Sequence, residues 1–116
     1  MHRSLILAVV LLAAPLDIAL AQRALQVDWE IATRRGVPRL RGYVSNDHPG
    51  NAGNVVLAVE TLDASGAVVS RSTHGVRGTV PPFGRLFYEI PVGDSPGSAY
   101  RVTVVAAEWF GGGGGP

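Results

Sequence analysis

Apolar and polar residues alternate along most of the chain from residue 25 onward. In residues 25–31, leucine, valine, tryptophan and isoleucine occupy every second position. A period of two is the spacing of side chains on one face of a β-strand, whereas a helix repeats every 3.6 residues. This stretch is therefore predicted to be a strand with one buried and one solvated face.

A second alternating stretch, with Leu40, Gly42 and Val44 on one face, follows a turn-forming Arg-Arg-Gly segment. If residues 35 and 36 form the turn, Glu30 lies opposite Arg41 and both apolar sets face the same side. The two stretches therefore predict a β-hairpin.

Several later stretches also predict strands, namely residues 54–62, 67–73, 75–80, 86–92 and 100–107. Residues 54–62 carry apolar side chains on both faces, which favours a central strand. The Asp-Ala-Ser-Gly segment 63–66 fits a type I turn, and residues 46–54 are predicted to be a loop because turn formers dominate them. Pro81 and Pro82 interrupt the strands because proline donates no backbone hydrogen bond.

Six or seven short strands with frequent turns are typical of a β-sandwich. The chain has 116 residues, of which 47% are hydrophobic and 16% charged, so one folded domain is expected rather than a disordered chain. The predicted fold is all-β: an immunoglobulin-like antiparallel β-sandwich over residues 22–110, followed by a flexible glycine-rich tail at residues 111–116. The side chains predicted to be buried in its core are Trp29, Leu57, Val59, Tyr88, Val102 and Val104.

Residues 1–21 have the pattern of a cleavable signal peptide. A short basic start precedes an apolar run, and Ala19-Leu20-Ala21 provides small residues for cleavage before Gln22. The alternative is a membrane anchor, but the apolar run is about half of the roughly 20 residues that span a bilayer. All ten Lys and Arg positions are arginine, as expected of a GC-rich bacterial genome. A periplasmic or secreted bacterial protein is therefore predicted.

Residues 40–104 resemble the bacterial FxLYD domains, which are immunoglobulin-like sandwiches of extracytoplasmic proteins. The features that carry the resemblance are Gly42-x-Val44-x-Asn46, Asn54-Val55, the Asp63-x-x-Gly66 turn, the proline-glycine turn and Tyr88-x-Ile90. The segment at the naming motif, residues 59–63, shares its final aspartate. The resemblance implies an extracytoplasmic immunoglobulin-like domain without catalytic residues.

The sequence lacks most motifs of catalysis and cofactor binding: it has no cysteine, no phosphate-binding glycine loop and no His-Glu-x-x-His. Gly-x-Ser-x-Gly occurs once, at residues 93–97, but in a predicted loop that precedes a strand, whereas a nucleophile elbow joins a strand to a helix. His48 and His74 are the only histidines after the expected cleavage, and Ser45, Asp47 and His48 lie too close along the chain for an ordinary triad. We predict that the protein is not an enzyme and binds no cofactor.

Two further groups of residues could bind a ligand, but a structural explanation is favoured for each. The asparagine-rich segment 46–54 could offer oxygen ligands to Ca²⁺, but Asp47 is its only carboxylate, so Asx turns are favoured over a metal site. Four arginines among residues 34–41 could bind nucleic acid with Tyr43. Acidic residues on the neighbouring strand favour a solvated, edge-protecting face instead.

The function predicted from these patterns is a non-catalytic module that binds or assembles with an unknown envelope protein. The alternative is a small structural or stress-protective protein without a ligand site. No nucleic-acid binding and no membrane insertion after cleavage are expected, and the oligomeric state stays open. The residues predicted to bind the partner are Asp47, His48, Asn51, Trp109 and Phe110. Convergence of aromatic side chains outside the core would favour the binding function over the alternative; the candidates are Tyr43, Phe83, Phe87, Trp109 and Phe110.

Overall fold

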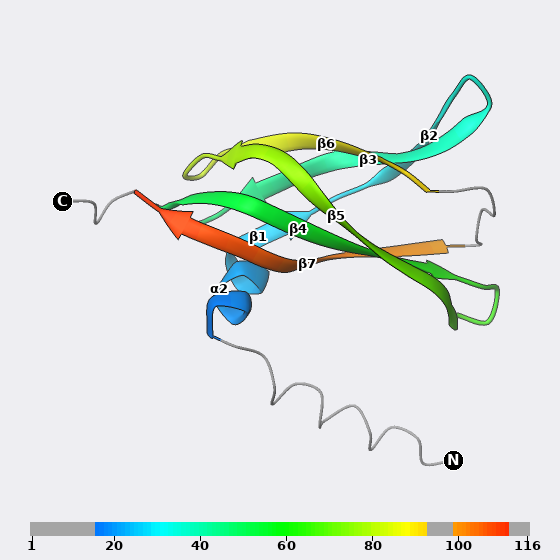
Figure 1. The fold of residues 1–116 in the computed structure, drawn as a ribbon, viewed down its shortest axis with the longest axis horizontal. Helices are drawn as coiled ribbons and strands as arrows, with labels where there is room; N and C mark the ends of the chain where they lie inside the picture. Colours follow the sequence, from blue (N-terminus) through cyan, green and yellow to red (C-terminus); the bar gives the residue numbers. More distant parts are fainter. Residues whose placement is uncertain (1–15, 93–98, 112–116) are drawn as a thin grey trace, which may run out of the picture.

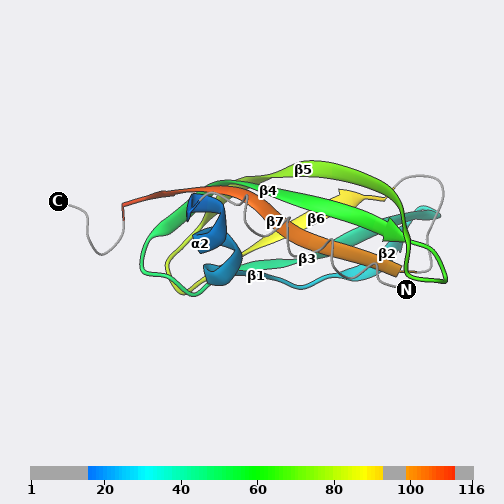
Figure 2. The same ribbon diagram turned by 90° about the horizontal axis from the view of Figure 1, so that it is seen from below.

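The computed structural model describes residues 16–92 and 99–111 as two antiparallel β-sheets that face each other, with one short helix at the edge (Figures 1 and 2). The all-β sandwich prediction is confirmed. Most of the expected signal peptide, the 93–98 segment and most of the expected tail lie outside the described residues. The elements are α2 (Leu16–Ala24), β1 (Leu25–Val27), β2 (Glu30–Arg34), β3 (Val37–Asn46), β4 (Asn51–Leu62), β5 (Val68–Val80), β6 (Arg85–Pro91) and β7 (Ala99–Phe110).

Each sheet is three strands wide. In the first, β3 lies at the centre, with β6 along one edge and both β1 and β2 along the other. In the second, β4 lies between β5 and β7, so the predicted central strand is confirmed. The strands β1 and β2 act as one interrupted strand, because both pair with β3 and together cover it from Val37 to Asn46.

The register of the β2–β3 hairpin is the predicted one. Arg34 pairs with Val37 next to the turn, and Glu30 lies opposite Arg41. Their side chains form an ion pair on the outer face, with 2.9 Å between Arg41 Nε and Glu30 Oε2. The alternation of apolar residues and the position of the turn were therefore sufficient to define this pairing.

The first predicted strand is interrupted at Asp28 and Trp29, where the sequence pattern indicated an unbroken one. Asp28 N donates to Tyr43 O, and the Asp28 carboxylate accepts from Tyr43 N at 2.8 Å in place of a backbone carbonyl. The Asp28 carbonyl turns inward and accepts from the hydroxyl of Tyr88 at 2.8 Å. Burial raises the pKa of Tyr88, so its hydroxyl stays a neutral donor.

Burial of Trp29 was a wrong prediction. Its side chain is 37% exposed, because the interruption moves it to the rim of the sandwich, where its ring meets Tyr100 edge-on at 6.0 Å. Burial of three other predicted core residues is confirmed, because Leu57, Val59 and Tyr88 are almost fully buried. Val104 is also buried, whereas Val102 is half-buried beside the core.

The connections around β4 and β5 differ from the predicted ones. The strand β4 begins at Asn51, so the loop before it covers only residues 47–50, and β5 is one strand where two were expected. The predicted turn at residues 63–66 is confirmed by a bond from Gly66 N to Asp63 O at 2.9 Å. The Asp63 carboxylate accepts from Ser65 and Ala67, which holds the pKa of that carboxyl below its usual value.

We expect Gly42→Ala to destabilise the domain by at least about 2 kcal/mol, because an added methyl group would overlap the inward-turned carbonyl of Asp28. Gly75→Ala is the matched control, since nothing lies within 4 Å of a Cβ added there. It should change the unfolding free energy by less than about 0.5 kcal/mol in urea denaturation. Equal losses of unfolding free energy for both variants would contradict the close approach of the Asp28 carbonyl to Gly42.

Candidate functional site

The buried side chain of Asn46 organises the end of the sandwich where the loops meet. Its amide nitrogen donates to the carbonyls of Gly50 at 2.8 Å, Pro81 at 3.1 Å and Val80 at 3.3 Å. Its amide oxygen accepts from His48 N at 2.9 Å, which is the predicted Asx turn. One side chain therefore fixes both the loop after β3 and the connection between β5 and β6.

The backbone beside Asn46 adds two more links. Asn46 N donates to Gly84 O and Asp47 N donates to Ala24 O, both at 2.8 Å. Because these bonds reach the turn between β5 and β6 and the end of α2, three segments of the chain are held together at this end: the loop after β3, that turn and the end of the helix. Side chains that project from it are therefore presented by rigid backbone.

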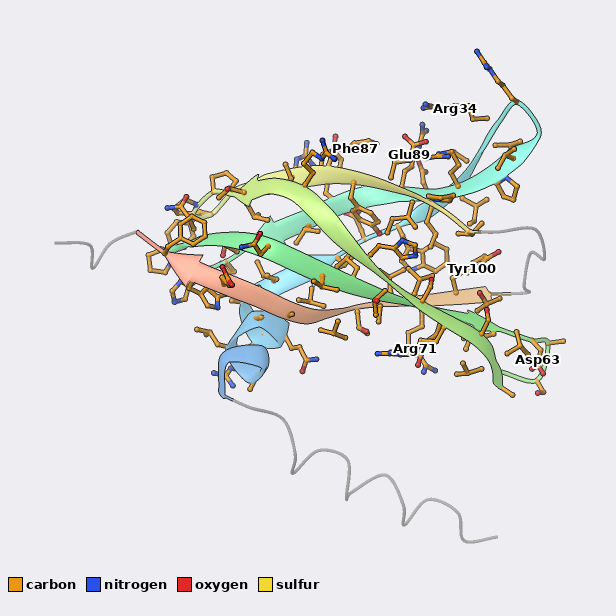
Figure 3. The ribbon with its side chains drawn as sticks, viewed as in Figure 1. Arg34, Asp63, Arg71, Phe87, Glu89 and Tyr100 are labelled. Atoms are coloured by element: carbon orange, nitrogen blue, oxygen red, sulfur yellow. The ribbon has the colours of Figure 1, made fainter. Side chains whose placement is uncertain are left out.

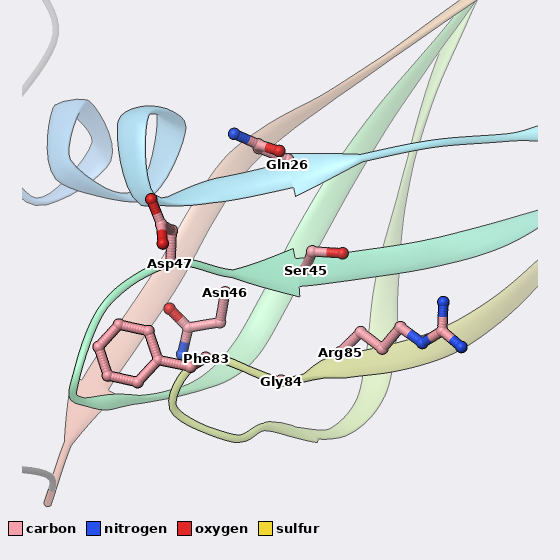
Figure 4. A pocket seen from close by; sticks show the side chains of 7 residues that line it. All are labelled: Gln26, Ser45, Asn46, Asp47, Phe83, Gly84 and Arg85. Atoms are coloured by element: carbon pink, nitrogen blue, oxygen red, sulfur yellow. The ribbon is translucent and has the colours of Figure 1, made fainter.

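An open hollow of about 540 Å³ lies beside this hydrogen-bonded end (Figure 4). Its side chains come from three neighbouring strands and two turns: Gln26 on β1, Ser45 and Asn46 on β3, Arg85 on β6, and Asp47 and Phe83 on the turns. The hollow thus combines an aromatic ring, a carboxylate, a guanidinium and uncharged polar groups. This is the composition of a surface that recognises polar and apolar groups together.

Phe83 departs from ordinary turn chemistry. Gly84 N donates to Pro81 O at 3.0 Å, so residues 81–84 form a β-turn, and Phe83 at its third position has a φ of +55°. This left-handed conformation favours glycine or asparagine, and it costs other residues on the order of 1 kcal/mol. The ring is nevertheless 68% exposed, so packing does not compensate for the strain.

Aromatic side chains extend from the hollow along the outer side of β3 and β6. The guanidinium of Arg85 lies 4.0 Å from the centre of the Tyr43 ring, and Tyr43 meets Phe87 edge-on at 5.6 Å. A second open hollow, of about 490 Å³, shares Arg85 with the first. We call the set Phe83, Arg85, Tyr43 and Phe87 the aromatic surface.

Ion pairs border the aromatic surface on the outer side of the same sheet. Glu89 contacts both Arg39 at 2.5 Å and Arg34 at 3.4 Å, and Glu30 contacts Arg41 as described (Figure 3). Three of the four arginines in residues 34–41 are therefore engaged by carboxylates. They supply little net positive charge for phosphate binding.

The structure brings together four of the five residues predicted to bind a partner. The rings of His48 and Trp109 lie 4.6 Å apart, and Asn51 Nδ2 donates to Phe110 O at 3.3 Å. Asp47 faces the other side of the loop and lines the hollow with Phe83 (Figure 4). The loop after β3 and the end of β7 thus form one end of the molecule.

The two aromatic residues at the end of β7 differ in their surroundings. Phe110 is 49% exposed and covers Gly53, but Trp109 packs against the core. The indole nitrogen of Trp109 is buried without a hydrogen-bond partner among the described residues. Trp109 is therefore mainly a packing residue, whereas Phe110 is exposed at this end and Phe83 and Phe87 are exposed at the aromatic surface.

Alternation left Tyr43, Phe87 and Phe110 outside the core, as the structure has them, but it misplaced Trp109 and could not predict which rings group together. Tyr43 and Phe87 lie opposite each other because of the β3–β6 register, which links segments far apart in the sequence. The only local signal at Phe83 is its place in a Pro-Pro-Phe-Gly turn, where the third position favours a residue with positive φ.

The described residues contain no group of three histidine, cysteine, aspartate or glutamate side chains arranged to hold a metal ion. Among the same residues, no helix combines the length and apolar character needed to cross a bilayer. No family model, curated protein or solved structure matches the chain.

Replacing Asn46 tests its organising role. In Asn46→Asp, a carboxylate would face three carbonyl oxygens, so we expect a loss of about 3 kcal/mol or more in unfolding free energy. Asn51→Asp is the matched control, because its amide makes one 3.3 Å bond in an exposed place, and it should cost less than about 1 kcal/mol. Similar urea midpoints for the two variants would show that Asn46 does not organise this end.

Proposed function

We propose that this protein is a non-catalytic β-sandwich module of the bacterial envelope that binds another protein through the aromatic surface. The observation that carries the proposal is Phe83, an exposed aromatic ring held in a strained backbone conformation beside a polar hollow. A departure from local folding rules without a packing gain is expected where function requires the residue.

Neighbouring residues support a protein partner over a small ligand. The hollow is open rather than enclosed, whereas small molecules favour clefts that bury most of their surface. Exposed aromatic residues and arginine are enriched where proteins bind each other, and here Phe87 and Arg85 extend the contact area beyond the hollow. Backbone fixed by Asn46 lowers the entropy cost of binding.

The extracytoplasmic location belongs to the same proposal. The signal-peptide pattern of residues 1–21 and the resemblance to FxLYD domains both support it. The two are independent, because the first rests on the leader and the second on residues 40–104. A surface without catalytic groups then acts by holding a partner in place.

Phe83→Asn tests the aromatic surface, because asparagine tolerates a positive φ. We expect the melting temperature to stay the same or rise, while binding is lost. Binding is measured with a photoreactive phenylalanine analogue in place of Phe87, which should give a discrete protein adduct in living cells. The Phe83→Asn substitution should abolish that adduct.

Val69→Thr is the matched control for this substitution. Val69 is 59% exposed on β5, in the other sheet, so the variant also removes an exposed apolar side chain. It should leave the adduct unchanged. No adduct from position 87 would favour the structural or stress-protective alternative, and an adduct that survives Phe83→Asn would show that Phe83 does not carry the binding.

Export is tested by the mass of the protein in the cell envelope. The expected form begins at Gln22, because Ala19 and Ala21 present the small side chains that signal peptidase requires. Intact mass spectrometry of the soluble envelope fraction gives the answer. Detection of Met1 in the envelope would contradict cleavage before Gln22, and the protein in membranes alone would show that the leader is an anchor.

A further inference from the structure

The strand β7 forms an edge of its sheet. Within the described residues it pairs with β4 on one side and with no strand on the other. At twelve residues it is long for an edge strand, and long edge strands expose backbone groups that pair with other chains. In a seven-stranded immunoglobulin sandwich, a further strand lies at such an edge.

The helix α2 covers the middle of this edge (Figure 1). Gln22 Nε2 donates to Val104 O at 2.9 Å, and Ala21 is fully buried against the core. An apolar groove of about 350 Å³ lies beside the helix, lined by residues of β1 and by Val102 of β7. Residues on both sides of the expected cleavage position, Ala21 and Gln22, thus occupy the place where another strand could pair.

The two halves of β7 mirror each other. Arg101 lies on the outer face opposite Glu60, and Val104 lies on the inner face opposite Leu57. Val105 has no partner on β4, and this extra residue reverses the alternation, so that Glu108 again lies on the outer face. Arg101 and Glu108 therefore lie on the same face, each the third residue from an end of the strand.

This symmetry makes β7 complementary to a second copy of itself. Antiparallel pairing along the whole strand places Arg101 of each copy opposite Glu108 of the other, and it places Tyr100 opposite Trp109 on the inner face. Opposite charges and aromatic residues at facing positions stabilise antiparallel pairs. A twofold axis between the copies would pass beside Val104 and Val105.

We propose that the chain forms a homodimer through β7 after cleavage before Gln22, and that α2 blocks this pairing in the uncleaved chain. Cleavage removes residues 16–21 of α2 and leaves Gln22 as the first residue, so the helix that holds the Gln22 side chain against Val104 O is lost and that carbonyl becomes available to a second strand. The sheets that contain β7, one from each copy, then join into one continuous sheet across the dimer, by strand addition. The inference rests on the export proposed above, and it does not depend on the aromatic surface.

Charge reversal at the two mirrored positions tests the dimer. The chain that begins at Gln22, recovered from the envelope, should sediment as a dimer in analytical ultracentrifugation. Arg101→Glu and Glu108→Arg each place like charges opposite each other twice, so each variant should dimerise about tenfold more weakly or worse. An equimolar mixture of the two variants should dimerise as the parent does, because both facing pairs are again opposite in charge.

Arg71→Glu is the matched control. Arg71 and Arg101 flank the same residue, Glu60, at 3.7 and 2.8 Å, but Arg71 lies on β5, which β4 separates from β7. The control loses a similar ion pair within the chain, so dimerisation should not change. A weakening equal to that of Arg101→Glu would overturn the proposal.

Further outcomes would overturn particular parts of the dimer proposal. A cleaved chain that stays monomeric at its highest soluble concentration, or a variant mixture that fails to dimerise, overturns the interface. A full-length chain that dimerises as strongly as the cleaved one overturns the blocking role of α2. Phe83→Asn should leave dimerisation intact, so a failure of the partner-binding proposal is distinguishable from a failure of the dimer.

Discussion

The hydrogen bonds of one buried amide, that of Asn46, determine how the loop end of this sandwich is built. Unpaired carbonyls at that depth would each lose their hydrogen bonds to water, and Asn46 reaches three of them while its oxygen closes the following turn. The same residue sets the position of Gly84 through its backbone nitrogen. The hollow and the position of the turn that carries Phe83 therefore depend on the hydrogen bonds of a residue outside the aromatic surface.

Stability and exposure are distributed unequally over the two faces of the first sheet. The inner face is apolar and close-packed, with Leu40 and Val44 fully buried. The outer face balances its charges internally, through Glu89 and Glu30, and leaves aromatic rings uncovered next to the ion pairs. Such a face holds its side chains in place before any partner arrives, because neighbouring side chains already fix them.

The sequence was informative wherever alternation and turn chemistry act locally. The β2–β3 register, the central position of β4 and the turn at Asp63 follow from them. The interruption at Asp28 could not be predicted, because it depends on a hydroxyl from β6 that is distant in the sequence. The grouping of Tyr43 with Phe87 has the same origin. Packing of Trp109 against the core was also missed, because the unpaired Val105 reverses the alternation before it.

Val105 makes the second half of β7 sensitive to chain length rather than to side-chain chemistry. Loss of this single residue would restore simple alternation, and every later side chain would then face the opposite side of the sheet. Glu108 would turn toward the apolar interior and Trp109 toward water. Substitutions at Val105 keep the count of residues and so preserve the orientation of both halves, whereas insertions and deletions do not. This strand is expected to vary in composition more freely than in length.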